Sequence, residues 1–572
     1  GAWSQAQFFD DPSQSFNQGL FYRTSTIDII VADTLGNAPR DISYYTIRPD
    51  GYASSAAEIT LFVTHFKAGA GSSDQDEREL EAERLRAFMN SQPSGKAMIV
   101  LGDFNMRSSN ENAYQDLVGF QAVNIGRMKD PLNAPGTWNN NASFASIHTQ
   151  SPRTTHLGDG GATGGMDDRF DQILITFNLD DGLGMDQVLG STVAFGNDGL
   201  HFNAAIVDAP TIPQGATVAD ALHTASDHLP VYMQFQVPAK ISATPFLAFG
   251  TVIEGGAAAQ NLNVANVAVA PADELDYSLS APAGFSAPGG SFQLNAGQNA
   301  NHSVSMNTGT FGVKGGNLTV SSDDVDAPNT LVPLSGTVLR HAAPSLSAAS
   351  VVLSDSLDFG CHMEGDFSDS CVAVSNDGHD SLQALLDVYG GSISGGNGRF
   401  SFVGGFNSAS VGGTPEKYTI HFDDNGAATT ADTTYTATLT FNTRDQQGLS
   451  GAVNQSDLTV YLSATVKGTG QLGVDDGLVP ALTVLAANRP NPFQSRTVIG
   501  FSLAEPGPVV LSIFDIQGRR VRVLADEFAP AGLTERAWDG RTDTGASAGP
   551  GIYFYRLETR DGVISRRMTK LR

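Results

Sequence analysis

The stretch AMIVLGDFN (97–105) decides the fold predicted for the first part of the chain. Its apolar run is typical of a strand buried on both faces of a sheet, and its polar end marks the sheet edge. ITLFVTHF (59–66) predicts a second such strand, and SDQDERELEAERLRAFMN (73–90) predicts an amphipathic helix between the two. FDQILIT (170–176) and LPVYMQFQV (229–237) predict further strands. The alternation of strands and helix indicates an α/β domain.

Polar residues gather where these strands begin or end. THFK (64–67) and LGDFN (101–105) close two strands, DDRFDQIL (167–174) leads into a third, and ASDHLPV (225–231) leads into a fourth. Carboxylates and imidazoles at buried strand ends are costly unless they pair or hold a metal ion. The candidate site residues are His65, Asp103, Asn105, Asp171, Asp227 and His228.

As an ordered set over about residues 19–236, these motifs resemble the endonuclease/exonuclease/phosphatase family, whose fold is that of pancreatic deoxyribonuclease. The resemblance implies an α/β four-layer sandwich that cleaves phosphate esters with a divalent metal, usually Mg²⁺, with Mn²⁺ or Ca²⁺ as alternatives. It implies that Asp227 and Asp103 are metal ligands. Oxygen ligands and retained waters suit Mg²⁺.

The same resemblance implies a role for each remaining candidate. His65 would contact the scissile phosphate, and Asp103 and Asn105 would orient the attacking water and hold the phosphate. His228 would be the general acid or base, or would stabilise the pentavalent phosphate, and Asp171 would orient and charge it. A histidine paired with a carboxylate has a raised pKa and can exchange a proton near neutrality.

One feature of the family is not found. Its members begin with two strands that carry an Asn and then a Glu, and the Glu is a principal metal ligand. Here the match starts near NQGLFYRTS (17–25), and no equivalent Glu is identified. Two interpretations stay open: a fragment of a longer enzyme, which the intact remaining motifs favour, or a degenerate domain that binds metal poorly.

Other polar residues of this part have two interpretations each. The segment LGDGGATGGMDD (157–168) is either a backbone nest for phosphate or a flexible loop. Arg169 contacts either phosphate or the carboxylate of Asp168. Four further histidines have no spacing that requires metal binding and are expected in loops: His148, His156, His201 and His223.

After Pro238 the helical periodicity nearly vanishes, and short alternating strands with Gly, Asn and Asp turns predict β-sandwiches. An internal repeat supports two of them, at 239–340 and 341–468. The matching elements are Phe249-Gly250 and Phe359-Gly360, Gly255 and Gly365, Asn266 and Asn376, and VPLSGTV (332–338) and VYLSATV (460–466). They resemble Ig-like modules of the abnormal-spindle/hydin and choice-of-anchor types, which implies spacers or adhesion units. Cys361 and Cys371 form either a hairpin disulfide or two unpaired thiols.

A Gly/Asp-rich linker (469–482) leads to a third predicted sandwich at 483–572. This last domain resembles the C-terminal sorting domain of type IX secretion substrates and the flagellar-hook-cap Ig-like domain. The resemblance rests on NRPNPF (488–493), LSIFDIQGRRVRVL (511–524), AWDG (537–540), GPGIYFYRL (549–557) and SRRMTKLR (565–572). It implies the secretion machinery as a partner and an extracellular or bacterial cell-surface location. The basic end is either a signal that a translocon reads or an edge strand, and Trp538 is expected in the core.

The composition limits the function. The 572 residues carry a net charge of −27, which excludes a nucleic-acid coat protein. Only 16% of them are charged, which argues against disorder driven by excess charge. No apolar run approaches the roughly 18 residues of a membrane-spanning helix. No signal peptide opens the chain, so the N-terminus is expected to be processed or internal.

Together these features predict a multidomain protein, with residues 1–238 as the endonuclease/exonuclease/phosphatase domain and three Ig-like sandwiches after it. The expected function is a secreted or surface-anchored metal-dependent phosphodiesterase, in the first place an extracellular nuclease with nucleic acid as substrate. Two alternatives stay open: a sphingomyelinase-like or other phosphate-ester hydrolase, because the domain is acidic, and a non-catalytic surface adhesin built on a degenerate domain. The sequence leaves the oligomeric state undetermined.

Overall fold

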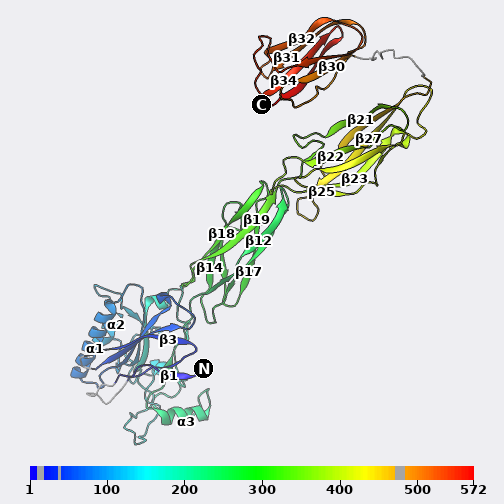
Figure 1. The fold of residues 1–572 in the computed structure, drawn as a ribbon. Coiled ribbons are helices and arrows are strands. Elements are labelled where there is room, and N and C mark those ends of the chain that lie inside the picture. The colour runs from blue at the N-terminus through cyan, green and yellow to red at the C-terminus, as the bar shows by residue number, and fades with distance from the viewer. Residues whose placement is uncertain (10–17, 37–39, 471–482) are drawn as a thin grey trace. The chain divides into compact units, whose positions relative to one another are not determined.

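The computed structural model describes residues 1–9, 18–36, 40–470 and 483–572 (Figure 1). The predicted linker 469–482 lies outside the described residues from 471 onward. The chain divides into two compact units, the first made of residues 1–360, 368–423 and 435–464, and the second of 361–367, 424–434 and 465–572. The expectation of a β-rich multidomain protein is confirmed.

A six-stranded sheet carries the candidate site. Its strand order is β3-β4-β5-β6-β8-β7, and β5 and β6 are parallel while the other neighbours are antiparallel. The predicted strands at 59–66, 97–104 and 170–176 are therefore confirmed as its centre. The strands are β3 (Ile27–Leu35), β4 (Ile42–Pro49), β5 (Ile59–His65), β6 (Ala97–Asp103), β7 (Met128–Lys129) and β8 (Asp171–Thr176).

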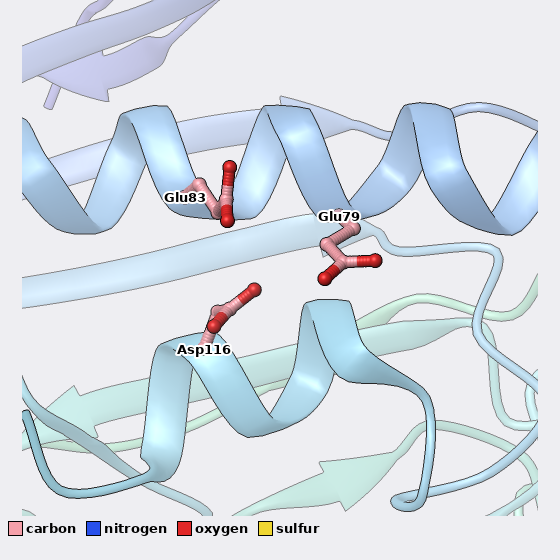
Figure 2. Close-up of side chains that lie close together, drawn as sticks. All are labelled: Glu79, Glu83 and Asp116. Carbon is pink, nitrogen blue, oxygen red and sulfur yellow. The ribbon is translucent and has the colours of Figure 1, made fainter.

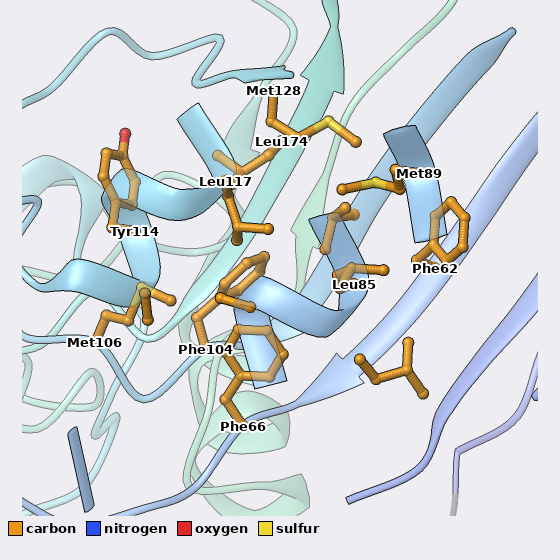
Figure 3. Packing of buried hydrophobic residues seen from close by; sticks show 14 of the residues in the cluster. Phe62, Phe66, Leu85, Met89, Phe104, Met106, Tyr114, Leu117, Met128 and Leu174 are labelled. Atoms are coloured by element: carbon orange, nitrogen blue, oxygen red, sulfur yellow. The ribbon is translucent and has the colours of Figure 1, made fainter. Parts of the chain in front are cut away.

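Two helices, α1 (Ser72–Asn90) and α2 (Asn112–Val118), cover one face of this sheet (Figure 1). Met98 and Val100, alternate residues of β6, belong to one buried cluster with Leu85 of α1 and Leu117 of α2. Figure 3 shows part of this cluster, with both leucines labelled. The helix predicted at 73–90 is confirmed within one residue. Burial of this cluster fixes which face of the sheet the helices cover.

The opposite face of the sheet is covered mainly by irregular chain. Ile59, Ile99 and Ile175 pack there against a segment that includes Leu179 and Met185. Strand pairing in this layer, among the described residues of 177–238, consists of the short β9–β10 ladder and isolated bridges at Phe235 and Val237, so the predicted four-layer sandwich is not confirmed. The strand predicted at 229–237 is only partly confirmed, because Val231 and Tyr232 join that ladder while Phe235 and Val237 make isolated bridges. The remaining elements here are β1 (Trp3–Gln5), β2 (Phe21–Arg23), β9 (Val193–Ala194), α3 (Ala216–Ala225), β10 (Val231–Tyr232) and 3₁₀ turns at Ser55–Ala57, Ala142–Ile147 and Phe177–Leu179.

Two β-rich segments follow with the same strand order. The first has sheets β11-β13-β17-β15 and β12-β19-β18-β14-β16, and the second has β20-β22-β26-β24 and β21-β28-β27-β23-β25, so each strand has a counterpart nine strands later. The first comprises β11 (Ile241–Ala243), β12 (Leu247–Ile253), β13 (Ala259–Asn266), β14 (Leu275–Ser280), β15 (Phe285–Ser286), β16 (Ser291–Leu294), β17 (Asn299–Met306), β18 (Gly312–Ser322) and β19 (Asn329–Leu339). The second comprises β20 (Pro344–Ser345), β21 (Ser354–His362), β22 (Ser370–Asn376), β23 (Leu386–Gly395), a 3₁₀ turn (Gly396–Gly398), β24 (Phe400–Phe402), β25 (Ala409–Val411), β26 (Glu416–Phe422), β27 (Thr433–Asp445) and β28 (Leu458–Val466).

The repeated residues occupy equivalent places in the two copies. Gly250 and Gly360 have φ of 70° and 84°, a left-handed conformation that favours glycine, within β12 and β21. Asn266 and Asn376 end β13 and β22, and each buried amide donates to two backbone carbonyls. The sequence repeat is therefore a structural repeat. Cys361 and Cys371 are free and exposed, so the disulfide interpretation is not supported.

The last segment contains a three-stranded sheet, β29-β30-β33, and a four-stranded sheet, β32-β31-β34-β35. Trp538 is fully buried in the core that both sheets share, as predicted. The basic C-terminus forms an edge strand of the larger sheet. None of the described helices is long and apolar enough to span a membrane. The strands are β29 (Val484–Leu485), β30 (Thr497–Leu503), β31 (Gly507–Asp515), β32 (Arg520–Ala529), β33 (Gly532–Trp538), β34 (Gly551–Thr559) and β35 (Gly562–Lys570).

Candidate functional site

Three adjacent strands place three of the predicted residues in one row. His65 ends β5 and lies opposite Asp103, which ends the parallel strand β6. Asp103 in turn lies opposite Asp171, the first residue of the antiparallel strand β8. The register alone therefore brings an imidazole and two carboxylates to one edge of the sheet.

The chain turns sharply around Asp103. Gly102 has φ of 132°, and a Cβ there would lie 2.0 Å from the carbonyl oxygen of Thr64 on the neighbouring strand, so only glycine fits. Asn105 adopts a left-handed φ of 51°, which Asn tolerates. Its side-chain amide donates to Asp103 Oδ2 at 2.9 Å and to the carbonyl of Phe66 at 3.0 Å. In this geometry Asn105 orients Asp103, and both of its amide hydrogens are engaged.

His228 joins the row from a distant part of the chain. Its Nδ1 lies 2.6 Å from Asp171 Oδ2, and its Nε2 lies 4.0 Å from Asp103 Oδ2. The side-chain amide nitrogen of Gln150 lies 2.6 Å from the same Nε2. An amide nitrogen only donates, so it binds this ring nitrogen when His228 is neutral, and a protonated His228 needs the amide oxygen in its place. The Asp171–His228 hydrogen bond fixes the ring, because a carboxylate on one nitrogen leaves the other nitrogen to face the centre of the site.

His65 approaches Asp103 from the other side, with Nε2 3.4 Å from Oδ2. Arg40 donates to the carbonyls of His65 and Phe66 at 3.0 and 2.9 Å, which holds the end of β5 and places a positive charge beside it. Two imidazoles thus flank a single carboxylate.

The two histidines have opposite protonation tendencies. Burial lowers the pKa of His65 to about 4, helped by the positive charges of Arg40 and His228. Burial also opposes protonation of His228, but the carboxylate of Asp171, followed by that of Asp103, outweighs it and raises its pKa to about 9. Burial raises the pKa of Asp103 to about 6 against the opposing charge of His228. At neutral pH the site therefore holds a neutral His65, a protonated His228 and an ionised Asp103.

Asp227 precedes His228 and adds to the negative charge around it. Its Oδ2 accepts a hydrogen bond of 2.6 Å from the backbone amide of Ala162, in the glycine-rich segment. The structure thus links Asp227 to that segment, while direct contacts link the other five predicted residues to one another.

Asp103 and Asp227 are the two predicted metal ligands, and their side chains are oxygen donors of the kind that divalent cations such as Mg²⁺ take. Asp103 and Asp227 offer two carboxylates, and Mg²⁺ is commonly bound through one or two carboxylates together with phosphate and water. Within the described chain, three close acidic ligands occur elsewhere, at Glu79, Glu83 and Asp116 between α1 and α2 (Figure 2). That cluster contains none of the predicted ligands.

Sequence reasoning missed Gln150 and Arg40, because neither lies in a recognisable motif and only the folded chain brings them to His228 and His65. It also misplaced Arg169. Both interpretations offered for this residue are wrong, since its buried guanidinium forms two hydrogen bonds to Asp130, at 2.8 and 2.9 Å. Bidentate pairing leaves Arg169 a structural residue.

No family model and no curated protein matches the chain. Among solved structures, the human Nocturnin catalytic domain with bound sulfate anion is 14% identical, covers 41% of this chain and 72% of that one, and has a TM-score of 0.26. D. rerio TDP2 complexed with single strand DNA product is also 14% identical, covers 41% and 77%, and has a TM-score of 0.26. A protein of unknown function from Porphyromonas gingivalis W83 is 16% identical, covers 40% and 100%, and has a TM-score of 0.17. The chain is thus weakly similar, over about two-fifths of its length, to these three structures.

Proposed function

We propose that the α/β part of the chain hydrolyses phosphate esters, in the first place the phosphodiester bonds of nucleic acid. The observation that carries this proposal is the row Asp171–His228–Asp103–His65, in which hydrogen bonds and burial separate the pKa values of two imidazoles. When two titratable groups have well separated pKa values, one is protonated and the other is not at the same pH. Such a pair can supply both an acid and a base.

Each residue of the row has a task in phosphodiester hydrolysis. Protonated His228 gives a proton to the leaving oxygen or neutralises charge on the phosphoryl group. Neutral His65 donates an N–H hydrogen bond to a phosphoryl oxygen, and ionised Asp103 orients the attacking water and accepts its proton. Asp171 holds the His228 ring in place by accepting a hydrogen bond from its Nδ1.

A divalent ion bound by Asp103 and Asp227 would neutralise phosphoryl oxygens and lower the pKa of bound water. Mg²⁺ is the first choice, with Mn²⁺ and Ca²⁺ as alternatives. The donor chemistry of the two carboxylates supports this assignment, together with the resemblance of the motifs.

A phospholipid or another phosphate ester is the second candidate substrate. The net charge of −27 favours it, because nucleases usually gain affinity from Lys and Arg contacts with phosphates. The two substrate classes differ in the leaving group and not in the chemistry of the site.

We further propose that the enzyme acts outside the cell or on a bacterial surface. On this proposal, residues 239–340 and 341–468 are Ig-like spacers, and residues 483–572 address the chain to the secretion machinery. The support is the structural repeat and the resemblance of the last segment to sorting domains.

A panel of substrates tests the activity. The purified chain is incubated with plasmid DNA, RNA, sphingomyelin vesicles and bis-p-nitrophenyl phosphate, each with Mg²⁺, Mn²⁺ or Ca²⁺ and with excess chelator. We expect hydrolysis of DNA or RNA that the chelator abolishes. Choline phosphate release without cleavage of nucleic acid would favour the second substrate. No hydrolysis of any member under any metal would contradict the proposed function and leave the adhesin alternative.

A further inference from the structure

Arg153 is a buried cation with an incomplete set of partners. Its side chain is 1% exposed, and its Nη1 donates to Asp159 Oδ2 at 2.6 Å. Its Nε has no hydrogen-bond partner among the described residues. A buried N–H without a partner is costly. The guanidinium is therefore available for a further acceptor, and Asp159, about half exposed, can leave it without becoming buried.

Arg153 lies beside the candidate site. A Cβ added at Gly161 would be 3.0 Å from Arg153 Nη2 and also 3.0 Å from Asp227 Cγ, so the guanidinium and that carboxylate flank the same glycine. Asp227 is followed directly by His228. The arginine thus borders the phosphate-cleaving row on the side of the glycine-rich segment.

The glycine-rich segment presents backbone amides to anions. Gly158, Gly160 and Gly164 have positive φ, and a Cβ at any of them would meet open space. The amides of Gly161 and Ala162 already bind carboxylates, from Asp159 at 3.1 Å and from Asp227 at 2.6 Å. Successive amides in such turns form concave sites for anions, including phosphate. Here two of the protein's own carboxylates fill that role.

We propose that Arg153 and the amides of residues 158–162 form a second phosphate subsite, which takes the phosphodiester next to the scissile one in a polynucleotide. Asp159 occupies this subsite when no substrate is bound, and the incoming phosphate replaces its carboxylate on Arg153. Phosphate accepts two hydrogen bonds from one guanidinium, and such charge-assisted pairs are strong. The subsite presupposes the proposed phosphodiesterase activity and extends it, because it selects substrates with more than one phosphate.

Substrates with one and with several phosphates test the subsite. The full chain is assayed on bis-p-nitrophenyl phosphate and on an eight-nucleotide single strand, and binding of the labelled strand is measured by anisotropy in chelator, where no turnover occurs. For Arg153→Lys we expect the KM and the Kd of the strand to rise about tenfold, because Lys cannot form the bidentate pair. The kinetics on the small ester should stay within about twofold of wild type, a margin that the context dependence of single substitutions allows.

Asp159→Asn gives the opposite expectation. Without the competing carboxylate, the KM of the strand should fall severalfold, while the small ester is unaffected. Arg48→Lys serves as the charge-matched control for Arg153→Lys, because Arg48 pairs with Glu58 just before β5, at the end away from His65. Its expected effect on both substrates is small.

The outcomes separate the subsite from the activity on which it depends. If wild type cleaves neither substrate, the proposed function fails, while the anisotropy still reports on phosphate binding. If Arg153→Lys lowers activity equally on both substrates and leaves the Kd unchanged, the arginine only supports the fold and the subsite is wrong. A higher KM of the strand in Asp159→Asn would also overturn it, because Asp159 would then hold Arg153 in its working position.

Discussion

At the scale of single residues, one carboxylate organises the candidate site. Asp103 lies between two imidazoles, at 3.4 Å from His65 and 4.0 Å from His228. The sequence predicted all three, because each follows or precedes an apolar strand in a motif. It predicted that pairing with Asp171 raises the pKa of His228, but it could not predict the lowered pKa of His65, which depends on burial and on Arg40.

The pH dependence of hydrolysis follows from these environments. Activity should fall above about pH 9 as His228 loses its proton. Asp171→Asn removes the charge that holds the proton on His228, so the alkaline limb should move down toward the ordinary histidine pKa. A kcat/KM profile from pH 5 to 10 measures this, and an alkaline limb that stays near 9 in the variant would contradict the role of Asp171.

Gly102 is the second residue with a strict requirement. Gly102→Ala places a Cβ 2.0 Å from Thr64 O at a φ of 132°, and should lower the free energy of unfolding by about 3 kcal/mol. Gly95→Ala is the matched control, because Gly95 has a φ of 82° but open space around it, and should cost about 1 kcal/mol. Urea unfolding measures the free energy of unfolding of both variants. Equal losses would contradict the claim that the close approach of Gly102 to Thr64 of β5 excludes a larger side chain.

At the scale of elements, the central strands and α1 were predictable because their apolar patterns are long and unbroken. The layer opposite α1 and α2 was not predictable, because residues 177–237 are mostly irregular chain around short elements and carry little periodicity. Residues 229–237 have the composition of a strand, yet their pairing is broken into the short ladder at Val231–Tyr232 and isolated bridges at Phe235 and Val237.

Helix α1 contains a carboxyl group whose charge opposes folding. Burial raises the pKa of Glu81 to about 7, although one oxygen accepts a hydrogen bond from the amide of Lys67. The folded chain then keeps a proton that the unfolded chain loses near its ordinary pKa of 4.5. Stability is therefore expected to fall as the pH rises from about 4.5 to about 7.

Glu81→Gln should remove this loss and stabilise the chain by roughly 1–3 kcal/mol at pH 8, with little effect at pH 4. Chemical unfolding at the two pH values measures the difference. Asp76→Asn, on the exposed side of the same helix, is the control and should change neither value. If Glu81→Gln destabilises the protein equally at both pH values, the Glu81 carboxyl contributes through packing and not through its charge.

At the scale of the whole molecule, the sequence repeat indicated two copies of one fold, and their strand orders are the same. Asn266 and Asn376 are buried at equivalent positions of the two copies. Each side-chain amide donates hydrogen bonds to two backbone carbonyls and so connects separate segments of its copy. The repeat was visible because these residues, like the glycines of β12 and β21, meet requirements of the backbone.

Asn266→Ala and Asn376→Ala should each destabilise their own copy by about 2 kcal/mol, because buried carbonyls lose their donors. Thermal unfolding of the full chain, followed together with proteolytic mapping, shows which copy opens first. The exposed Asn261→Ala is the control for the first copy. If neither Asn266→Ala nor Asn376→Ala lowers the unfolding temperature more than Asn261→Ala does, the two buried amides contribute no stability.

The most direct test of the central claim compares wild type with His228→Ala and Asp103→Ala in the hydrolysis of a phosphodiester. We expect wild type to cleave with a divalent metal, and each variant to lose about a thousandfold in kcat. The urea unfolding midpoint should change little, because these side chains lie at the strand ends and not in the apolar core. Wild-type rates in either variant, or a wild type that stays inactive on every phosphodiester, would contradict the claim that this row of residues cleaves phosphate esters.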